Sequence, residues 1–115
     1  MDDDERARVS LGSLVTSLGF STCAFASARE CLDSDFESLS CIISDIQMPD
    51  VNGLQLAHML RSRPNCPPII LITAFPRPSL MKQAAAAGAA FFVEKPLSPG
   101  ILLDILSTLS IKKGA

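Results

Sequence analysis

The chain lacks several features that would assign it to a function class directly. Its 115 residues include no tryptophan, no tyrosine and a single histidine, and ten basic residues nearly balance twelve acidic ones, for a formal charge of -2. Binding to nucleic acid or to an anionic lipid surface relies on a strongly positive face. The composition therefore argues against direct binding to DNA or to a membrane surface.

Metal-binding cysteine motifs and long apolar runs are absent as well. The four cysteines show no CxxC spacing, and no histidine cluster accompanies them, so a zinc site is not expected and the thiols should be reduced. The apolar runs are short and are broken by Ser, Asp, Glu or Pro, and the first residues are acidic where a signal peptide would be basic. We expect a cytoplasmic protein without a membrane span.

The apolar residues that are present predict a sheet of strands with both faces covered. Apolar residues make up 48% of the chain, enough to bury one core, so we expect a single domain over residues 1–115. Nearly continuous apolar runs of strand length occur at 41–44, 69–72 and 90–93, and residues 20–26 read as a further strand. Such runs are typical of parallel strands that are buried on both faces.

Helices are expected to alternate with these strands. Apolar residues at spacings of three and four between 11 and 18, closed by Gly19, predict an amphipathic first helix. Ser27 followed by Glu30 three residues later is a capping-box pattern, which predicts a helix from about residue 28. Further helices are expected from near Gly53, with Leu56, Met59 and Leu60 facing inward, around residues 84–87 before Gly88, and after Ser98-Pro99.

Polar side chains stand directly after three of the expected strands: Asp45, Thr73 and Lys95. In an open α/β sheet, ligands bind at the carboxyl ends of the parallel strands, so these side chains should share one crevice. Asp2 and Asp3 precede the first helix and can reach the same edge. Clustered carboxylates repel one another unless a proton or a divalent cation neutralises them, and oxygen ligands favour Mg²⁺. The pattern therefore predicts phosphoryl chemistry assisted by magnesium.

With these residues in place, the sequence resembles the receiver domains of bacterial response regulators, most of all those of the FixJ-type branch. The resemblance covers nearly the whole chain. It rests on the acidic pair Asp2-Asp3, the segment SDIQMPDVNG from Ser44 to Gly53, and the groups Thr73-Ala74, Ala87-Gly88-Ala89 and Glu94-Lys95-Pro96. It implies a flavodoxin-like (βα)5 doubly wound parallel sheet with strand order 2-1-3-4-5.

The resemblance also implies a phosphoacceptor and a metal site. Asp45 would take a phosphoryl group from a sensor histidine kinase. Asp2, Asp3 and Asp45, together with the backbone carbonyl of Gln47, would bind Mg²⁺. A domain of this kind assists its own phosphorylation and dephosphorylation but is a signalling module and not an enzyme.

Three further residues would carry the response to phosphorylation. By the resemblance, Thr73 would hydrogen-bond a phosphoryl oxygen, and Lys95 would pair with the acyl phosphate next to a cis bond to Pro96. Phe92 would be the aromatic switch residue. The added charge would shift the population of two conformations and so control an output domain, commonly a transcriptional one, or a partner.

Two other functions fit part of the pattern. A pseudo-receiver would act as a protein-interaction module without phosphorylation, although the presence of Asp45, Thr73 and Lys95 argues against this. An aspartyl-phosphate phosphatase would need an acid/base carboxylate two residues after Asp45, where Gln47 stands. No output domain is expected within the 115 residues, so DNA would be reached only through a separate domain. Whether the chain forms a homodimer is left open.

The beginning of the chain departs from the family pattern. Receivers start with an apolar strand that leads into the acidic pair, whereas only Met1 precedes Asp2 here. We therefore expect a receiver that lacks its first, central strand. Burial of some five apolar residues, at about 1.5 to 3 kcal/mol each, would be lost. The monomer should be poorly stable, or should compensate by rearranging its strands or by pairing them with a second chain.

Overall fold

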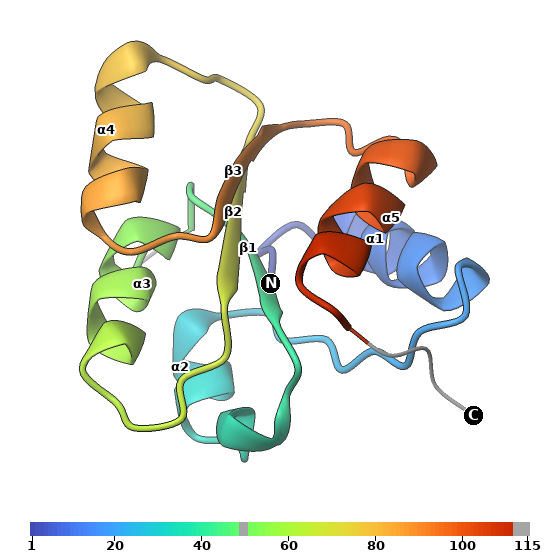
Figure 1. Ribbon diagram of the computed structural model, residues 1–115, viewed down its shortest axis with the longest axis horizontal. Coiled ribbons are helices and arrows are strands. Elements are labelled where there is room, and N and C mark those ends of the chain that lie inside the picture. Colours follow the sequence, from blue (N-terminus) through green and yellow to red (C-terminus); the bar gives the residue numbers. More distant parts are fainter. Residues whose placement is uncertain (49–50, 112–115) are drawn as a thin grey trace.

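Three parallel strands form a sheet that separates two groups of helices (Figure 1). The computed structural model describes residues 1–48 and 51–111, so Pro49 and Asp50 of the resemblance segment lie outside the described residues. The elements in chain order are α1 (Glu5–Ser17), α2 (Ala28–Leu32), the 3-10 helix η1 (Phe36–Ser38), β1 (Ile42–Asp45), α3 (Gly53–Arg61), β2 (Ile69–Thr73), α4 (Pro78–Ala86), β3 (Phe91–Glu94) and α5 (Pro99–Thr108).

The sheet has the order β1-β2-β3, and each strand is parallel to its neighbour. Ile42 pairs with Ile69 at the start of β1, and Ile70 pairs with Phe91 at the start of β3. Helices α3 and α4 supply the connections between these strands. The three predicted apolar runs at 41–44, 69–72 and 90–93 are therefore confirmed as strands of one parallel α/β sheet.

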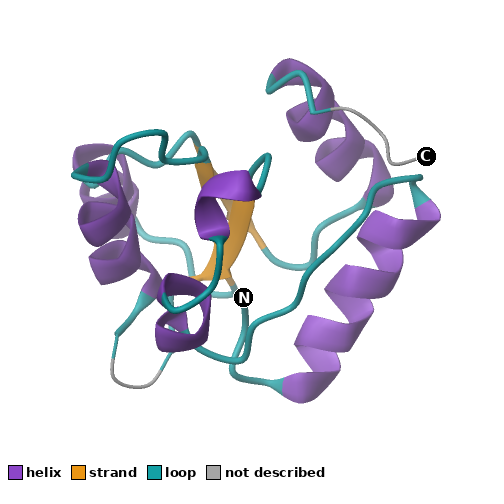
Figure 2. Ribbon diagram, turned by 90° about the horizontal axis from the view of Figure 1, so that it is seen from below, coloured by secondary structure: helices purple, strands orange, loops and turns teal. Residues whose placement is uncertain are grey.

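Alternate residues of the central strand β2 enter two different cores. Ile69 and Leu71 pack into the core beneath α2, α3 and α4, while Ile70 and Ile72 pack against α5 on the other face. Figures 1 and 2 show α1 and α5 together on this second side of the sheet. All five residues of β2 are buried, which explains why its sequence has no polar alternation.

Local capping signals define where the helices begin. The side chain of Ser27 accepts a hydrogen bond from the Glu30 N–H at the start of α2, as the capping-box pattern predicted. Asn52 and Gln55 form a reciprocal capping box at α3, and Ser98 caps α5 ahead of Pro99. None of the described helices is long and apolar enough to cross a membrane.

Two predictions about local structure were wrong. Residues 20–26 were expected to form a strand, but they form none in the described part of the chain, and a cavity lies between this segment and β1. In α3, Met59 is 43% exposed, whereas Leu56 and Leu60 are fully buried. At 100° per residue, the buried stripe of α3 includes Ala57 on one side of Leu56 and Leu60, and Met59 lies beyond its other border.

Candidate functional site

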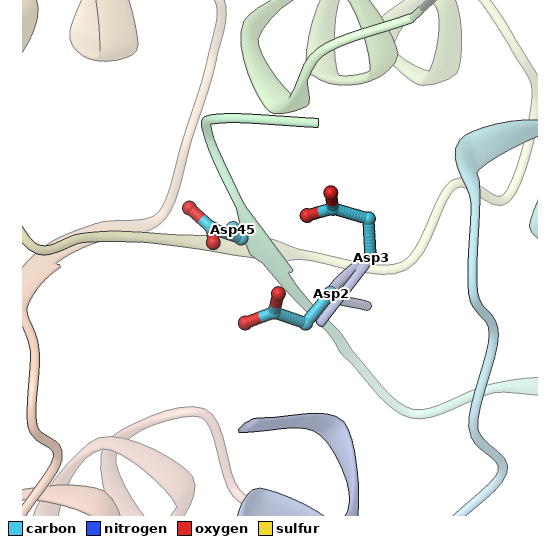
Figure 3. Close-up of side chains that lie close together, drawn as sticks. All are labelled: Asp2, Asp3 and Asp45. Atoms are coloured by element: carbon cyan, nitrogen blue, oxygen red, sulfur yellow. The ribbon is translucent and has the colours of Figure 1, made fainter. Parts of the chain in front are cut away.

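The carboxyl ends of the strands bring the predicted site residues to one edge of the sheet. Asp45 is the last residue of β1, Thr73 is the last residue of β2, and Lys95 directly follows β3. Asp2 and Asp3 come from the segment that precedes α1, and their carboxylates lie beside that of Asp45 (Figure 3). Residues from both ends of the chain therefore meet at one site, as the sequence predicted.

Met1 holds the acidic pair in place by pairing with β1. The Asp45 N–H donates to the Met1 carbonyl at 2.8 Å, and the terminal amine of Met1 donates to the Ile43 carbonyl. These two bonds on either side of Ser44 are the pattern of one rung in a parallel ladder. Asp2 follows this rung at once and is only 3% exposed. The rung therefore places Asp2 next to Asp45.

Lys95 joins the two buried carboxylates. Its Nζ donates to Asp2 Oδ2 at 2.7 Å and to Asp45 Oδ2 at 2.8 Å. Burial of the Lys95 side chain opposes its charge, but the hydrogen bonds to Asp2 and Asp45 outweigh this effect and raise the pKa of Lys95 above its ordinary value. Lys95 therefore carries a positive charge at the site.

Three carboxylates remain close together around this one ammonium group. One oxygen from each of Asp2, Asp3 and Asp45 lies within 4.8 Å of the others. Three clustered carboxylates share the one ammonium group of Lys95, an arrangement that favours a bound cation. The donors are all oxygen, and Asp3 is exposed toward solvent, so the donor set fits a hard ion such as Mg²⁺ that keeps part of its water shell.

Backbone donors fix the orientation of the acidic side chains. The Gln47 N–H donates to Asp45 Oδ1 at 3.1 Å, and the Asp4 N–H donates to Asp2 Oδ1 at 3.0 Å. Each of these two carboxylates therefore has one oxygen on a backbone amide and the other on Lys95. No buried side-chain nitrogen or oxygen within the described residues lacks a hydrogen-bond partner.

Thr73 lies at the same edge but is bonded to a different residue. Its hydroxyl donates to Gln47 Oε1 at 3.1 Å and accepts the Phe75 N–H at 3.1 Å. The family resemblance implied a role for the backbone carbonyl of Gln47, and the contact between its side chain and Thr73 was not anticipated. One sequence signal could have indicated this contact: Gln47 is a polar residue only two positions after Asp45, at the same edge of the sheet.

Gly53, at the first position of α3, allows the backbone to pack closely under Asp45. A Cβ atom at this residue would lie 2.6 Å from the Asp45 carbonyl oxygen and 3.0 Å from Ile46 Cα. The Gly53 N–H donates to the Ile46 carbonyl at 3.0 Å, which ties the helix to the end of β1. Only glycine fits this approach, and the site depends on it.

The remaining predicted residues lie on or next to β3. The Lys95-Pro96 peptide bond is cis, as expected, and the Lys95 N–H donates to the Thr73 carbonyl at 2.8 Å. Phe92 is partly buried and packs against the core beneath α3 and α4. Phe92 therefore extends from β3 into this core.

Comparisons with known proteins agree with this geometry. The family model of the response regulator receiver domain matches residues 1–107. The chain is 36% identical to the C4-dicarboxylate transport transcriptional regulatory protein DctR of Rhodobacter capsulatus, over 99% of this chain and 60% of that protein. It is 34% identical to the transcriptional regulatory protein FixJ of Bradyrhizobium diazoefficiens, over 94% of this chain and 53% of that protein.

A solved structure gives the same result for the fold. The crystal structure of a response regulator receiver protein from Burkholderia phymatum matches with a TM-score of 0.81 and 28% identity, over 100% of this chain and 95% of that chain. The chain spans about half the length of the curated relatives that it matches. On the family match, the sequence identity and the shared fold, the chain belongs to the response regulator receiver domain family.

Proposed function

We propose that this chain is the phosphoacceptor of a two-component signalling pathway and that Asp45 takes a phosphoryl group from a sensor histidine kinase. The observation that carries the proposal is the environment of Asp45. Asp45 is 7% exposed and stands at the end of β1, and its carboxylate is 2.8 Å from the Lys95 ammonium in a cluster with two further carboxylates. The family membership of the chain supports the same role.

In the transfer step, a carboxylate oxygen of Asp45 forms a bond to phosphorus while the bond between phosphorus and the kinase histidine nitrogen breaks. The electron pair of the broken bond stays on the imidazole. Lys95 already points its ammonium group at this carboxylate and would neutralise part of the charge on the phosphoryl oxygens. The Gln47 N–H would keep the Asp45 side chain oriented during the transfer.

We propose that Mg²⁺ is the cofactor, held by the carboxylates of Asp2, Asp3 and Asp45 and by the backbone carbonyl of Gln47. A bound Mg²⁺ supplies positive charge next to the phosphoryl oxygens. Asp2 and Asp45 share Lys95, so the metal would use their free lone pairs together with the exposed carboxylate of Asp3.

The response would begin at Thr73. In the structure its hydroxyl donates to Gln47, so it must leave that acceptor before it can bond a phosphoryl oxygen on Asp45. Movement of Thr73 toward Asp45 would open space into which Phe92 turns, and the surface beside β3 would follow. The phosphoryl group thus favours one of two conformations by differential contacts.

Other parts of the proposal concern what surrounds this chain. Residues 1–115 would act as one receiver domain and would reach DNA only through a separate output domain. The domain would also assist hydrolysis of its own acyl phosphate and so limit the lifetime of the signal. Its pairing into a homodimer and its location in the cytoplasm stay predictions.

Incubation with acetyl phosphate and Mg²⁺ tests the proposal. The chain should gain one phosphoryl group by intact mass, Asp45→Asn should gain none, and Asp104→Asn, an exposed substitution on α5, should behave as the unchanged chain. A chain that gains no phosphoryl group would be a pseudo-receiver, and continuous release of phosphate would indicate a phosphatase. Labelling of Asp45→Asn at the normal level would refute the assignment.

Lys95→Ala separates the acceptor from the response. Asp45 should still be labelled, but the change in the amide NMR spectrum on phosphorylation should be reduced, because Lys95 connects the new charge to β3. Lys82→Ala, an exposed substitution on α4, is the matched control. A full spectral response in Lys95→Ala would show that the coupling does not pass through this residue.

A further inference from the structure

Thr73, the last residue of β2, connects two loops through its one hydroxyl group. The Thr73 side chain is fully buried, so its polar group needs partners inside the protein. The hydroxyl oxygen accepts the Phe75 N–H at 3.1 Å, and the hydroxyl proton goes to Gln47 Oε1, also at 3.1 Å. A hydroxyl group has a single proton to donate. While Thr73 donates to Gln47, it therefore cannot donate to a group on Asp45.

Gln47 contacts both residues that the proposed phosphoryl group would join. Its backbone N–H donates to Asp45 Oδ1 at 3.1 Å, and its side chain accepts the Thr73 hydroxyl. Asp45 pairs with Ile72, the residue before Thr73, so the ends of β1 and β2 are adjacent. The backbone contact fixes where Gln47 lies, and its side chain then spans from the end of β1 to the end of β2.

The surroundings of Gln47 allow this contact to break at little cost. Gln47 is exposed and lines an open hollow together with Asn52, Arg77 and Gln83. Its amide can therefore turn toward water without disturbing the core. A neutral hydrogen bond in such a place contributes little net free energy, because water replaces the lost partner. The Thr73 hydroxyl, in contrast, is buried and still needs an acceptor when Gln47 leaves.

A charged acceptor would compete with the Gln47 amide for the hydroxyl proton of Thr73. In the unphosphorylated chain both oxygens of Asp45 already accept hydrogen bonds, one from Lys95 and one from the Gln47 N–H, and Thr73 donates to the neutral amide. A phosphoryl group on Asp45 would add ionised oxygens next to the end of β2. Hydrogen bonds to ionised oxygens are roughly twice as strong as those between neutral groups. The strength of the acceptor thus decides which partner Thr73 takes in each state.

We propose that Gln47 is a positioning residue for the response: its side-chain amide holds Thr73 in the resting place and so sets the fraction of unphosphorylated chain that adopts the responding conformation. The inference rests on the proposed function, because the competing acceptor is the phosphoryl group on Asp45. Removal of the amide leaves the buried hydroxyl without its acceptor, which makes the resting conformation less favourable relative to the responding one. The Gln47 side chain acts through Thr73 and does not need to touch the phosphoryl group.

A purely structural role for this contact predicts a different pattern of effects. If Gln47 only satisfied the Thr73 hydroxyl, its removal would lower stability and leave the distribution between the two conformations unchanged. If Gln47 holds Thr73, its removal should also loosen the Phe75 N–H, since that amide depends on the same hydroxyl oxygen. Phe75 is 74% exposed, so its amide reports on the loop after β2 and not on opening of the core.

The direct test is amide hydrogen exchange at Phe75, measured by NMR in the unphosphorylated 115-residue chain. Gln47→Met keeps the length of the side chain and the backbone carbonyl but removes the acceptor. We expect Phe75 to exchange about fivefold faster, which is the effect of losing one neutral hydrogen bond. The amide resonances of Ala74 and Arg77 should move part of the way toward their positions in the phosphorylated chain. Gln83→Met is the matched control, because it makes the same change in the same hollow.

Two further variants separate the hydrogen bond from other effects of the Gln47 side chain. Gln47→Glu keeps an acceptor at the same length, so Phe75 should exchange at the rate of the unchanged chain or more slowly. Thr73→Val removes the hydroxyl while keeping the shape of the side chain, and Phe75 then loses its acceptor in any case. In the Thr73→Val background, Gln47→Met should therefore have no further effect. This double-mutant cycle assigns the effect to the contact between the two side chains.

Several outcomes would overturn the proposal. These are unchanged exchange and resonances in Gln47→Met, an equal effect of Gln83→Met, and a full effect of Gln47→Met in the Thr73→Val background. Intact mass after incubation with acetyl phosphate and Mg²⁺ distinguishes this failure from failure of the proposed function. A chain that is labelled, but whose Gln47→Met variant behaves as the unchanged chain, refutes only the role of Gln47. A chain that gains no phosphoryl group refutes the proposed function and this inference with it.

Discussion

The carboxyl ends of the strands and the edge of β1 that faces away from β2 differ in how completely their polar groups are hydrogen-bonded. At the carboxyl ends, Asp2, Asp45 and Lys95 form a connected set of hydrogen bonds. Along the edge of β1, a cavity lies between the strand and residues 20–25, and none of the described residues pairs with that segment as a strand. Both regions border Met1, so the change from one to the other occurs within a few residues.

This difference teaches that contacts at the carboxyl end of β1 position the acidic cluster. Met1 supplies one rung beside β1, and that rung places Asp2 within reach of Lys95. Helix α3 packs on the end of β1 through Gly53. Substitutions in the walls of the cavity are therefore expected to affect stability more than the geometry of the acidic cluster.

The largest expected difference between the two regions is in the cost of truncating an apolar side chain. Leu71 is fully buried in the closed core, so Leu71→Ala should lower the free energy of unfolding by about 2 to 5 kcal/mol. Val15 is partly buried and lines the cavity, so Val15→Ala should cost about 1 kcal/mol or less. Urea unfolding monitored by circular dichroism measures both. Equal costs would mean that the cavity wall is packed as tightly as the core.

Substitution of Gly53 and of Gly100 compares the close packing beneath Asp45 with a position that has free space around it. Gly53→Ala should destabilise the fold by about 1 to 3 kcal/mol, because its Cβ atom would meet the Asp45 carbonyl oxygen at 2.6 Å. Gly100→Ala should stabilise α5 by about 0.5 to 1 kcal/mol, since a Cβ atom there meets nothing within 4 Å. Thermal unfolding of both variants gives the sign of each effect. A neutral Gly53→Ala would show that α3 can shift without disturbing β1.

The sequence predicted those parts of the structure that depend on local pattern. The strands β1, β2 and β3 follow from their apolar runs, and the convergence of Asp45, Thr73 and Lys95 follows from their places after these runs. The closeness of Asp2 to Asp45 was also predicted. These inferences succeeded because a parallel sheet fixes which ends of its strands are adjacent.

The predictions that failed, and the contact that was not anticipated, depend on partners far away in the chain. Residues 20–26 have the composition of a strand, yet none of the described residues pairs with them, so they form no strand. The hydrogen bond between Thr73 and Gln47 joins residues 26 positions apart, and no local pattern specifies it. The exposure of Met59 depends on the side from which the sheet covers α3, which spacing alone does not fix.

The smallest perturbation that compares the two regions is alkylation of the free thiols. Cys31 is fully buried in the closed core, Cys41 is partly buried and lines the cavity, and Cys23 is exposed. Burial raises the pKa of both Cys31 and Cys41, so less of each is present as the reactive thiolate at neutral pH.

With iodoacetamide, Cys23 should react first, Cys41 more slowly, and Cys31 only when the core opens. Raising the pH should accelerate Cys41 by forming its thiolate, while Cys31 stays limited by access. Peptide mass spectrometry at a series of times gives the three rates, and equal rates for Cys31 and Cys41 would show that the closed core opens as readily as the edge of β1.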